Sequence, residues 1–255
     1  MKSILKVLAL VYFISNLFSC GPILYSNVGQ NVPLFQEKGE FSGQVSFSAS
    51  DGSWSASGIG LQGAYSISDK VAAIGSYYSM KDDDLSNQNE WEGSGSHFEF
   101  GVGLFGGKPE KKIQYEGFLG MGLGSINNKS LVTPGDFFNV NYLKPFIQPS
   151  IAFSTKYFEL AVTPRIAYLT YTSQDDYNID QNTEQVDPRE FFNKSSNTLI
   201  LEPGIMLRGG FPRAKLELQY NFSTLREPFE RFSVINNSFF SLGLRFLIAD
   251  RTSSK

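Results

Sequence analysis

The chain has 255 residues, a formal net charge of −3 and a charged fraction of 18%, which lies below the roughly 25% of an average soluble protein. This balance excludes the basic surface that binding to nucleic acid requires. After the N-terminal apolar run, no segment has the roughly 18 consecutive apolar residues that a membrane-spanning helix needs. Hydrophobic residues recur instead with the period of two that is typical of β-strands.

Residues 1–19 have the layout of a secretory signal peptide. A basic start is followed by a mostly apolar run that ends at Ser19, just before Cys20. Cys20 is the only cysteine, so an exported chain offers it no intramolecular partner. With Leu17 three positions earlier, the site resembles the lipobox of bacterial lipoproteins, which implies cleavage before Cys20 and attachment of diacylglycerol to its sulfur. The alternative is an ordinary cleaved signal with an incidental cysteine.

Residues 20–38 are predicted to be a lipidated tether that leads into the first strand. Pro33 stiffens this approach. Leu34 and Phe35 are expected to pack on the base of the barrel or in the membrane interface. Gly39 is expected to allow a sharp turn into the strand.

Residues 39–250 are predicted to form one domain of alternating β-strands. In the first strand, Phe41, Val45 and Phe47 share one face while polar residues share the other. A tilted strand that crosses a bilayer needs about nine to eleven residues, whereas globular strands average about five or six, and most of the runs reach the longer figure. The ten runs cover residues 39–49, 55–67, 70–80, 95–106, 112–124, 141–154, 157–171, 197–208, 213–223 and 238–249.

The connections between these runs alternate in length. Tight turns join one end of the strands, and long polar loops are expected at the other end. Short turns opposite long loops are typical of an outer-membrane barrel. An even number of strands places both ends of the barrel at the short-turn, periplasmic side, and Cys20 with its tether is expected on that side too. The long loops are predicted near residues 50–54, 81–94, 125–140, 172–196 and 224–237.

Alternation alone does not say which face of the strands meets lipid. A soluble sandwich or lipocalin-like calyx carries the same stripe with its apolar face turned inward. Strand length, loop asymmetry and aromatic residues near strand ends favour the membrane barrel. Four prolines inside predicted strands lack a ladder donor, so bulges or bends are expected, above all in 141–154. These prolines are Pro145, Pro149, Pro164 and Pro203.

If the apolar face meets lipid, the other face lines a lumen. A buried charge persists only when it is paired, and a wide aqueous pore usually needs more strands. We therefore predict a largely filled lumen with an ion-paired network of four acids and four bases. Its members are Glu99, Glu116, Glu202, Glu217, Arg165, Arg208, Lys215 and Arg245.

Candidate chemistry is sparse, and no metal or cofactor is predicted. With one cysteine and one histidine there is no Cys/His metal spacing, and no nucleophile elbow, phosphate loop or HExxH motif occurs. His97 follows an acidic loop, where a pairing with Asp82, Asp83 or Asp84 could activate water. Omptin-type surface proteases have ten strands and use acidic residues and a histidine at that rim, and this chain resembles them in architecture alone. The plainer interpretation is a structural histidine, with folding and any activity intact in His97→Ala.

Two of the predicted loops are strongly acidic. Residues 81–94 and 172–196 each have an excess of four negative charges. Clustered carboxylates can hold Ca²⁺, but the spacing here is not that of an EF-hand. The favoured interpretation is that these loops are solvated, repel their neighbours and stay soluble themselves.

One segment carries a family resemblance. The order is Cys20, a short tether, N-V-P-L-F-Q-E-K-G-E at 31–40 and then Q-G-A-Y-S-I-S-D-K-V at 62–71. This order resembles a group of largely uncharacterised outer-membrane β-barrel lipoproteins from Bacteroidota. The resemblance is most specific over residues 20–71. It implies a location and a fold, and it implies no activity.

The sequence thus predicts an all-β protein, an antiparallel up-and-down barrel of about ten strands in the outer membrane of a Gram-negative bacterium, anchored through Cys20. A structural, surface-interaction or narrow solute-passage role without catalysis is expected. The expected partners are membrane lipid and either a small solute or a surface partner, with no nucleic acid. The alternatives are a lipid-anchored soluble barrel that binds an apolar ligand, and a hydrolase that uses His97 at the rim.

Overall fold

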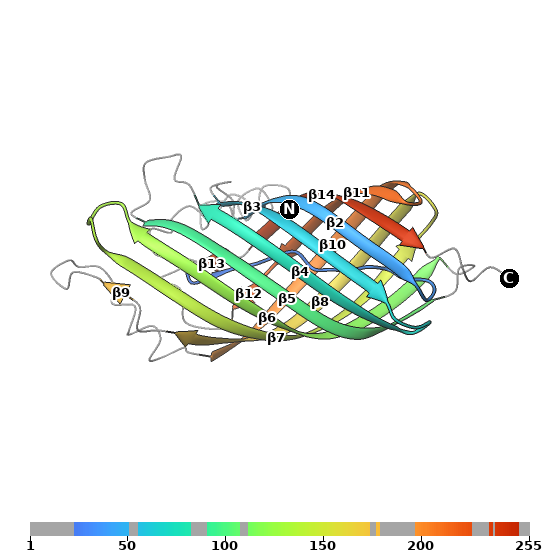
Figure 1. The fold of residues 1–255 in the computed structure, drawn as a ribbon, viewed down its shortest axis with the longest axis horizontal. Coiled ribbons are helices and arrows are strands. Elements are labelled where there is room, and N and C mark those ends of the chain that lie inside the picture. The colour runs from blue at the N-terminus through green and yellow to red at the C-terminus, as the bar shows by residue number, and fades with distance from the viewer. Residues whose placement is uncertain are drawn as a thin grey trace, which may run out of the picture.

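The computed structural model describes residues 23–50, 56–82, 91–107, 112–173, 177–178, 197–225, 235–236 and 238–249. Within this part of the chain, no helix is long and apolar enough to cross a membrane. Ten long strands form the wall of a closed barrel (Figure 1). They are β2 (Glu40–Ser50), β3 (Ala56–Ser66), β4 (Val71–Asp82), β5 (Trp91–Gly107), β6 (Ile113–Ser130), β7 (Phe137–Ser154), β8 (Phe158–Ser173), β10 (Asn197–Phe211), β11 (Ala214–Phe222) and β14 (Ser238–Ala249).

Each wall strand pairs with its neighbours in antiparallel register. The last strand, β14, pairs with the first, β2, from Phe239 opposite Ser50 to Ala249 opposite Glu40, which closes the barrel. Four short strands accompany the wall: β9 (Tyr177–Asn178) pairs with β7, β12 (Thr224–Leu225) with β10, and β1 (Tyr25–Ser26) with β13 (Ile235–Asn236). A closed barrel has no open strand edge. The predicted ten-stranded, up-and-down barrel is confirmed.

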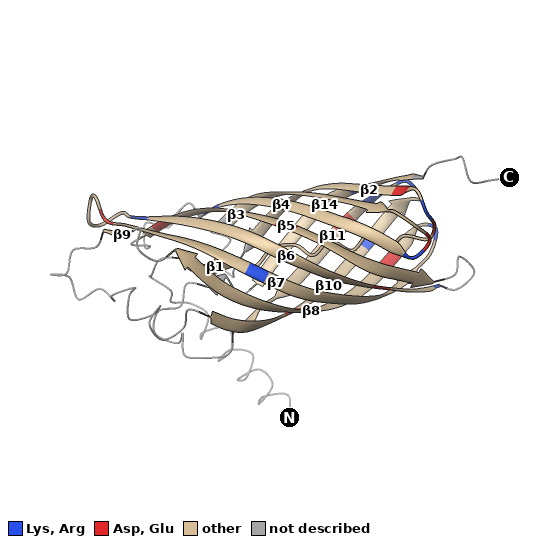
Figure 2. Cartoon of the chain, turned by 60° about the horizontal axis from the view of Figure 1, so that its bottom comes forward, with Lys and Arg blue, Asp and Glu red and all other residues tan. Residues whose placement is uncertain are grey.

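The apolar face of the wall points outward. Phe47 is 69% exposed and Val102 is 60% exposed, while the polar side chains between them, such as Gln44 and Glu99, are buried. Figure 2 shows that charged residues are sparse along the strands. A soluble protein does not expose an apolar belt of this size, so the belt faces lipid and the strands span a membrane. The soluble calyx, whose apolar face would point inward, is therefore wrong.

The two ends of the barrel differ as expected, with one correction. Short turns at 67–70, 155–157 and 212–213 define the short-turn end. The strands β5, β6 and β7 have 17, 18 and 18 residues, and they extend the barrel at the opposite, long-loop end. The loop predicted at 125–140 is therefore wrong in its extent, because most of it lies in β6 and β7 and the connection spans only 131–136. Most of the other predicted long loops lie outside the described residues.

The prolines in the wall do not shift the register. Pro145 and Pro149 lie in β7, and the pairing of β7 with β8 resumes in the same register after each of them. The register shift in this pair lies instead at Asn141 and Tyr142. In the neighbouring pair, Pro164 of β8 stands opposite Pro203 of β10. The prolines thus remove ladder donors without displacing strands, and the predicted sixth strand is confirmed.

Residues 23–35, here called the lumen segment, run through the inside of the barrel. Every residue from Ile23 to Phe35 is buried, and the segment can be followed in blue between the strands in Figure 1. Gly39 makes the predicted sharp turn into β2 with a φ of 85°, a conformation that glycine adopts at little cost. The expectation that this region would stay at the short-turn side is wrong, because the segment crosses the lumen to the opposite end.

Candidate functional site

The lumen segment is bonded to the wall along its whole length, beginning at the short-turn end. The backbone N–H of Leu34 donates to Glu116 (2.9 Å), and the Arg245 guanidinium donates to the carbonyl of Pro33. The side-chain amide of Gln148 donates to the carbonyl of Asn31 (2.8 Å). Because buried backbone groups need partners, these polar wall residues allow a segment that is mostly outside any strand to lie in the lumen.

Near the middle of the barrel, Gln219 pairs with the segment as a neighbouring strand would. Its side-chain oxygen accepts from the Gln30 N–H (2.9 Å), and its side-chain nitrogen donates to the Gln30 carbonyl (2.7 Å). On another side, the Asn31 amide donates to the carbonyls of Gly63 and Gly75 (3.0 and 3.2 Å). The segment is therefore held from several parts of the wall at one level.

At the long-loop end, Asn128 of β6 brackets the beginning of the segment. Its side-chain oxygen accepts from the Ile23 N–H (2.7 Å), and its side-chain nitrogen donates to the Ile23 carbonyl (2.9 Å). The Tyr171 hydroxyl donates to the Leu24 carbonyl (3.1 Å). The surrounding apolar cluster consists of Ile23, Leu24, Tyr25, Trp91, Ile126, Phe138, Val140, Tyr142, Leu169, Tyr171 and Ile200.

A central cluster of four charged side chains lies below this apolar layer. Glu99 contacts Arg165 (2.8 Å) and Lys144 (3.0 Å), and the same two bases lie 3.6 and 3.5 Å from Glu202. The Tyr25 hydroxyl of the lumen segment donates to Glu202 and accepts from Lys144 (3.1 Å). Because opposite charges surround each member, the cluster satisfies the pairing that burial demands.

A second group, the turn-end cluster, contains Glu159, Arg208, Lys215, Glu217 and Arg245. Glu159 forms its centre, with Arg208 at 3.2 Å, Arg245 at 3.4 Å and Lys215 also in contact. Arg208 also pairs with Glu217. All of these side chains are buried. Removal of the central carboxylate would therefore leave several cations without their main partner.

All eight charged residues predicted to line the lumen lie inside the barrel and are buried. Seven of them form ion pairs, whereas Glu116 accepts a backbone hydrogen bond from the lumen segment. Sequence reasoning missed Lys144 and Glu159, which complete the two clusters. It also missed the lumen segment itself, although residues 23–35 contain no charged side chain, which is unusual for an exposed tether.

His97 lies within the lumen, in contact with the central cluster. Its Nε2 is 2.9 Å from Glu99, and its ring stacks on Tyr142 with centroids 5.6 Å apart. Only 1% of its surface is exposed, so the environment offers no access to a substrate at the rim. Of the predicted acidic partners, Asp83 and Asp84 lie outside the described residues.

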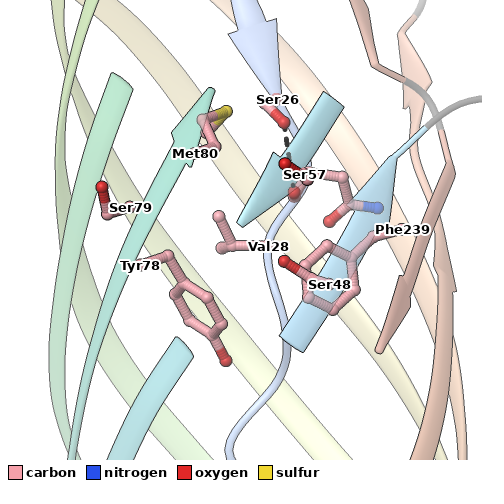
Figure 3. Close-up of a pocket in the computed structure, with 9 residues that line it drawn as sticks. Ser26, Val28, Ser48, Ser57, Tyr78, Ser79, Met80 and Phe239 are labelled. Carbon is pink, nitrogen blue, oxygen red and sulfur yellow. Dashed lines mark hydrogen bonds between the residues drawn. The ribbon is translucent and has the colours of Figure 1, made fainter. Parts of the chain in front are cut away.

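A small cavity beside the lumen segment has room for a water molecule and little more (Figure 3). Its wall combines the Tyr78 and Phe239 rings with serine residues of β2, β3 and β4. Neither side-chain amide atom of Asn27 has a hydrogen-bond partner within the described residues. Because buried amides need partners, a bound water would satisfy Asn27 here.

Metal binding finds no support in the part of the chain that the structure describes. No group of three or more His, Cys, Asp or Glu side chains there is arranged to hold an ion. Four carboxylates of the lumen, those of Glu99, Glu159, Glu202 and Glu217, have Lys or Arg partners instead. Cys20 and the predicted signal peptide lie outside the described residues.

Comparison with solved structures finds other membrane barrels. Ail of Yersinia pestis in a nanodisc is 12% identical, with 83% of this chain and 100% of that chain covered and a TM-score of 0.37. The outer membrane protease OmpT of Escherichia coli is 11% identical (82% and 94% covered, TM-score 0.39), and an outer membrane channel of Pseudomonas putida F1 is 8% identical (87% and 99%, TM-score 0.35). No family model and no curated protein matches the chain. Similarities this weak carry no argument about activity.

Proposed function

We propose that this protein is a lipid-anchored barrel of the Gram-negative outer membrane with a structural or surface-interaction role and no catalytic activity. Its lumen is closed by its own N-terminal segment. The observation that carries the proposal is the complete burial of residues 23–35 inside the barrel. Passage of even a small solute would require this segment to leave the lumen.

The contacts of the segment support a permanent closure. Its backbone is bonded near both ends and in the middle, by Asn128, Gln219 and Glu116. Each such bond is worth about 0.5–1.5 kcal/mol, and each buried group left without a partner costs about 1–3 kcal/mol. Withdrawal of the segment would break these bonds together and leave Tyr25 and Phe35 without their aromatic partners.

Planar-bilayer conductance tests the closure. The full protein is expected to give no stable steps, whereas deletion of residues 23–35 is expected to produce discrete openings, because the wall then encloses water. An equally long deletion of residues 183–195, in a predicted loop, serves as the control and should stay silent. Large, stable and weakly selective conductance from the full protein would contradict the proposal. Heat-modifiable gel mobility of each variant shows that the barrel has formed.

A further inference from the structure

We propose that the chain leaves the barrel at the long-loop end, so that the lipid on Cys20 is inserted in the outer leaflet of the membrane. The direction of the chain at Ile23 follows from the lumen segment alone. The lipid half of the statement rests on the proposed function. A protein of this kind would cross the membrane with its strands and anchor itself from the outer surface.

The direction of the lumen segment fixes the exit. Beside β2, the N–H of Gly39 donates to the Ser66 carbonyl (3.0 Å), next to a short turn. Leu34 is bonded near the start of β6 at Glu116, and Ile23 near its end at Asn128. The segment thus travels the length of β6, from the short-turn end to the long-loop end. Ile23 also lies against Gly93, at the beginning of β5.

The distance from Ile23 to Cys20 is too short for a return. An extended chain spans at most about 3.3–3.6 Å per residue, so three residues reach roughly 10–11 Å. The hydrocarbon core of a bilayer is about 30 Å thick. These three residues therefore keep Cys20 near the long-loop end and cannot carry it back to the short-turn side.

The two barrel ends identify the leaflet. In outer-membrane barrels the short turns lie in the periplasm and the longer loops lie outside the cell. The long-loop end here is the end at which β5, β6 and β7 extend and near which Ile23 lies. A diacylglycerol group attached three residues before Ile23 is therefore held at the outer leaflet.

Thiol labelling of intact cells tests the proposal. The chain has one cysteine, so in Pro22→Cys a lipidated Cys20 leaves the introduced thiol as the only reactive one. Val132→Cys, in the exposed 131–136 connection, marks the long-loop end, and Lys156→Cys marks the short-turn end. A membrane-impermeant maleimide is expected to label Pro22→Cys and Val132→Cys in intact cells, and Lys156→Cys only after permeabilisation. Labelling after denaturation gives the total for each variant.

The labelling outcomes test separately the end at which the chain leaves the barrel, the leaflet and the lipid on Cys20. If Pro22→Cys behaves like Lys156→Cys, the exit at the long-loop end is overturned. If Lys156→Cys is labelled in intact cells and the other two are not, the assignment to the outer leaflet is overturned. Labelling of Cys20 in the unaltered protein would overturn the lipid half alone, because a thioether does not react with maleimide. Conductance measurements on the same preparations report separately on the closed lumen.

Discussion

At the long-loop end the backbone of the lumen segment is bonded by the neutral side chains of Asn128 and Tyr171, whereas at the short-turn end it is bonded by charged ones. Ile23 and Leu24 pack in a cluster that contains no charged residue. At the other end, Glu116 and Arg245 bond the peptide groups around Pro33 and Leu34.

The two ends hold the segment by apolar packing alike and differ in the charge of the groups that bond its backbone. Apolar packing, which depends on side-chain shape, occurs at both ends: Ile23 and Leu24 pack at the long-loop end, and Leu34 and Phe35 pack at the short-turn end. The bonds from Glu116 and Arg245 reach peptide groups, so at the short-turn end charged side chains also fix the path of the backbone. The sharp bend at Leu34, with a φ of 55°, belongs to this path, since a residue other than glycine adopts it only at a cost.

The largest effect is expected from the centre of the turn-end cluster. Glu159→Gln removes the carboxylate that Arg208, Arg245 and Lys215 share. Because breaking a buried ion pair costs about 3–5 kcal/mol, the free energy of unfolding should fall by that amount in denaturant titrations of the detergent-solubilised barrel. Glu92→Gln is the matched control, since its partner Lys81 is more than half exposed and a surface pair contributes about 0–1 kcal/mol. Equal losses in the two variants would contradict a buried cluster.

A slightly smaller effect is expected at the long-loop end. Leu24→Ala leaves a cavity in the apolar cluster, where a Leu→Ala change costs roughly 2–5 kcal/mol. The same change at Leu216, which is 61% exposed on the outer wall, removes contact with lipid only and serves as the control. If Leu24→Ala unfolds at the same denaturant concentration as the unaltered protein, apolar packing does not stabilise the long-loop end.

The packing around the middle of the segment can be tested by adding one carbon atom, the Cβ of an alanine, at Gly29. A Cβ at Gly29 would overlap the Tyr78 hydroxyl and the Gln219 side chain, whereas a Cβ at Gly63 would meet no atom within 4 Å. Overpacking costs about 1–3 kcal/mol, so Gly29→Ala should lower the unfolding free energy and Gly63→Ala should lower it less. If the two alanines behave alike, the segment does not pass Tyr78 as described.

The smallest effect is expected from one hydroxyl. Tyr25→Phe retains the ring that packs on Tyr142 and removes the hydrogen bonds to Glu202 and Lys144. A net loss of about 1 kcal/mol is expected, with the apolar packing unchanged. A loss as large as that of Leu24→Ala would show that polar contacts, and not packing, hold this end of the segment.

The sequence predicted the wall well because the alternation of apolar and polar residues is a local signal. Phe41, Val45 and Phe47 show the period of two, and the same period placed Glu99 and Arg165 in the lumen. The extensions of β6 and β7 were missed because Asn127 and Asn139, like loop residues, are polar on the face that alternation would assign to lipid.

The lumen segment could not be predicted from local pattern. Its residues are mixed apolar and amide types with no strand period, and their partners lie up to 212 positions away, as between Pro33 and Arg245. Only the absence of charge from 23–35 was available as a signal. His97 was assigned to the rim because sequence gives position along a strand but not depth within a filled barrel, where Glu99 and Tyr142 enclose it.

Amide hydrogen exchange tests directly whether residues 23–35 lie inside the barrel. In the folded barrel the N–H groups of Ile23, Gln30 and Leu34 donate to buried side chains, and exchange of such groups requires opening of the structure. In nanodiscs, peptides that cover residues 23–35 are therefore expected to take up deuterium as slowly as those from β5 and β6. Uptake as fast as that of an unstructured peptide would show that the segment lies outside the lumen.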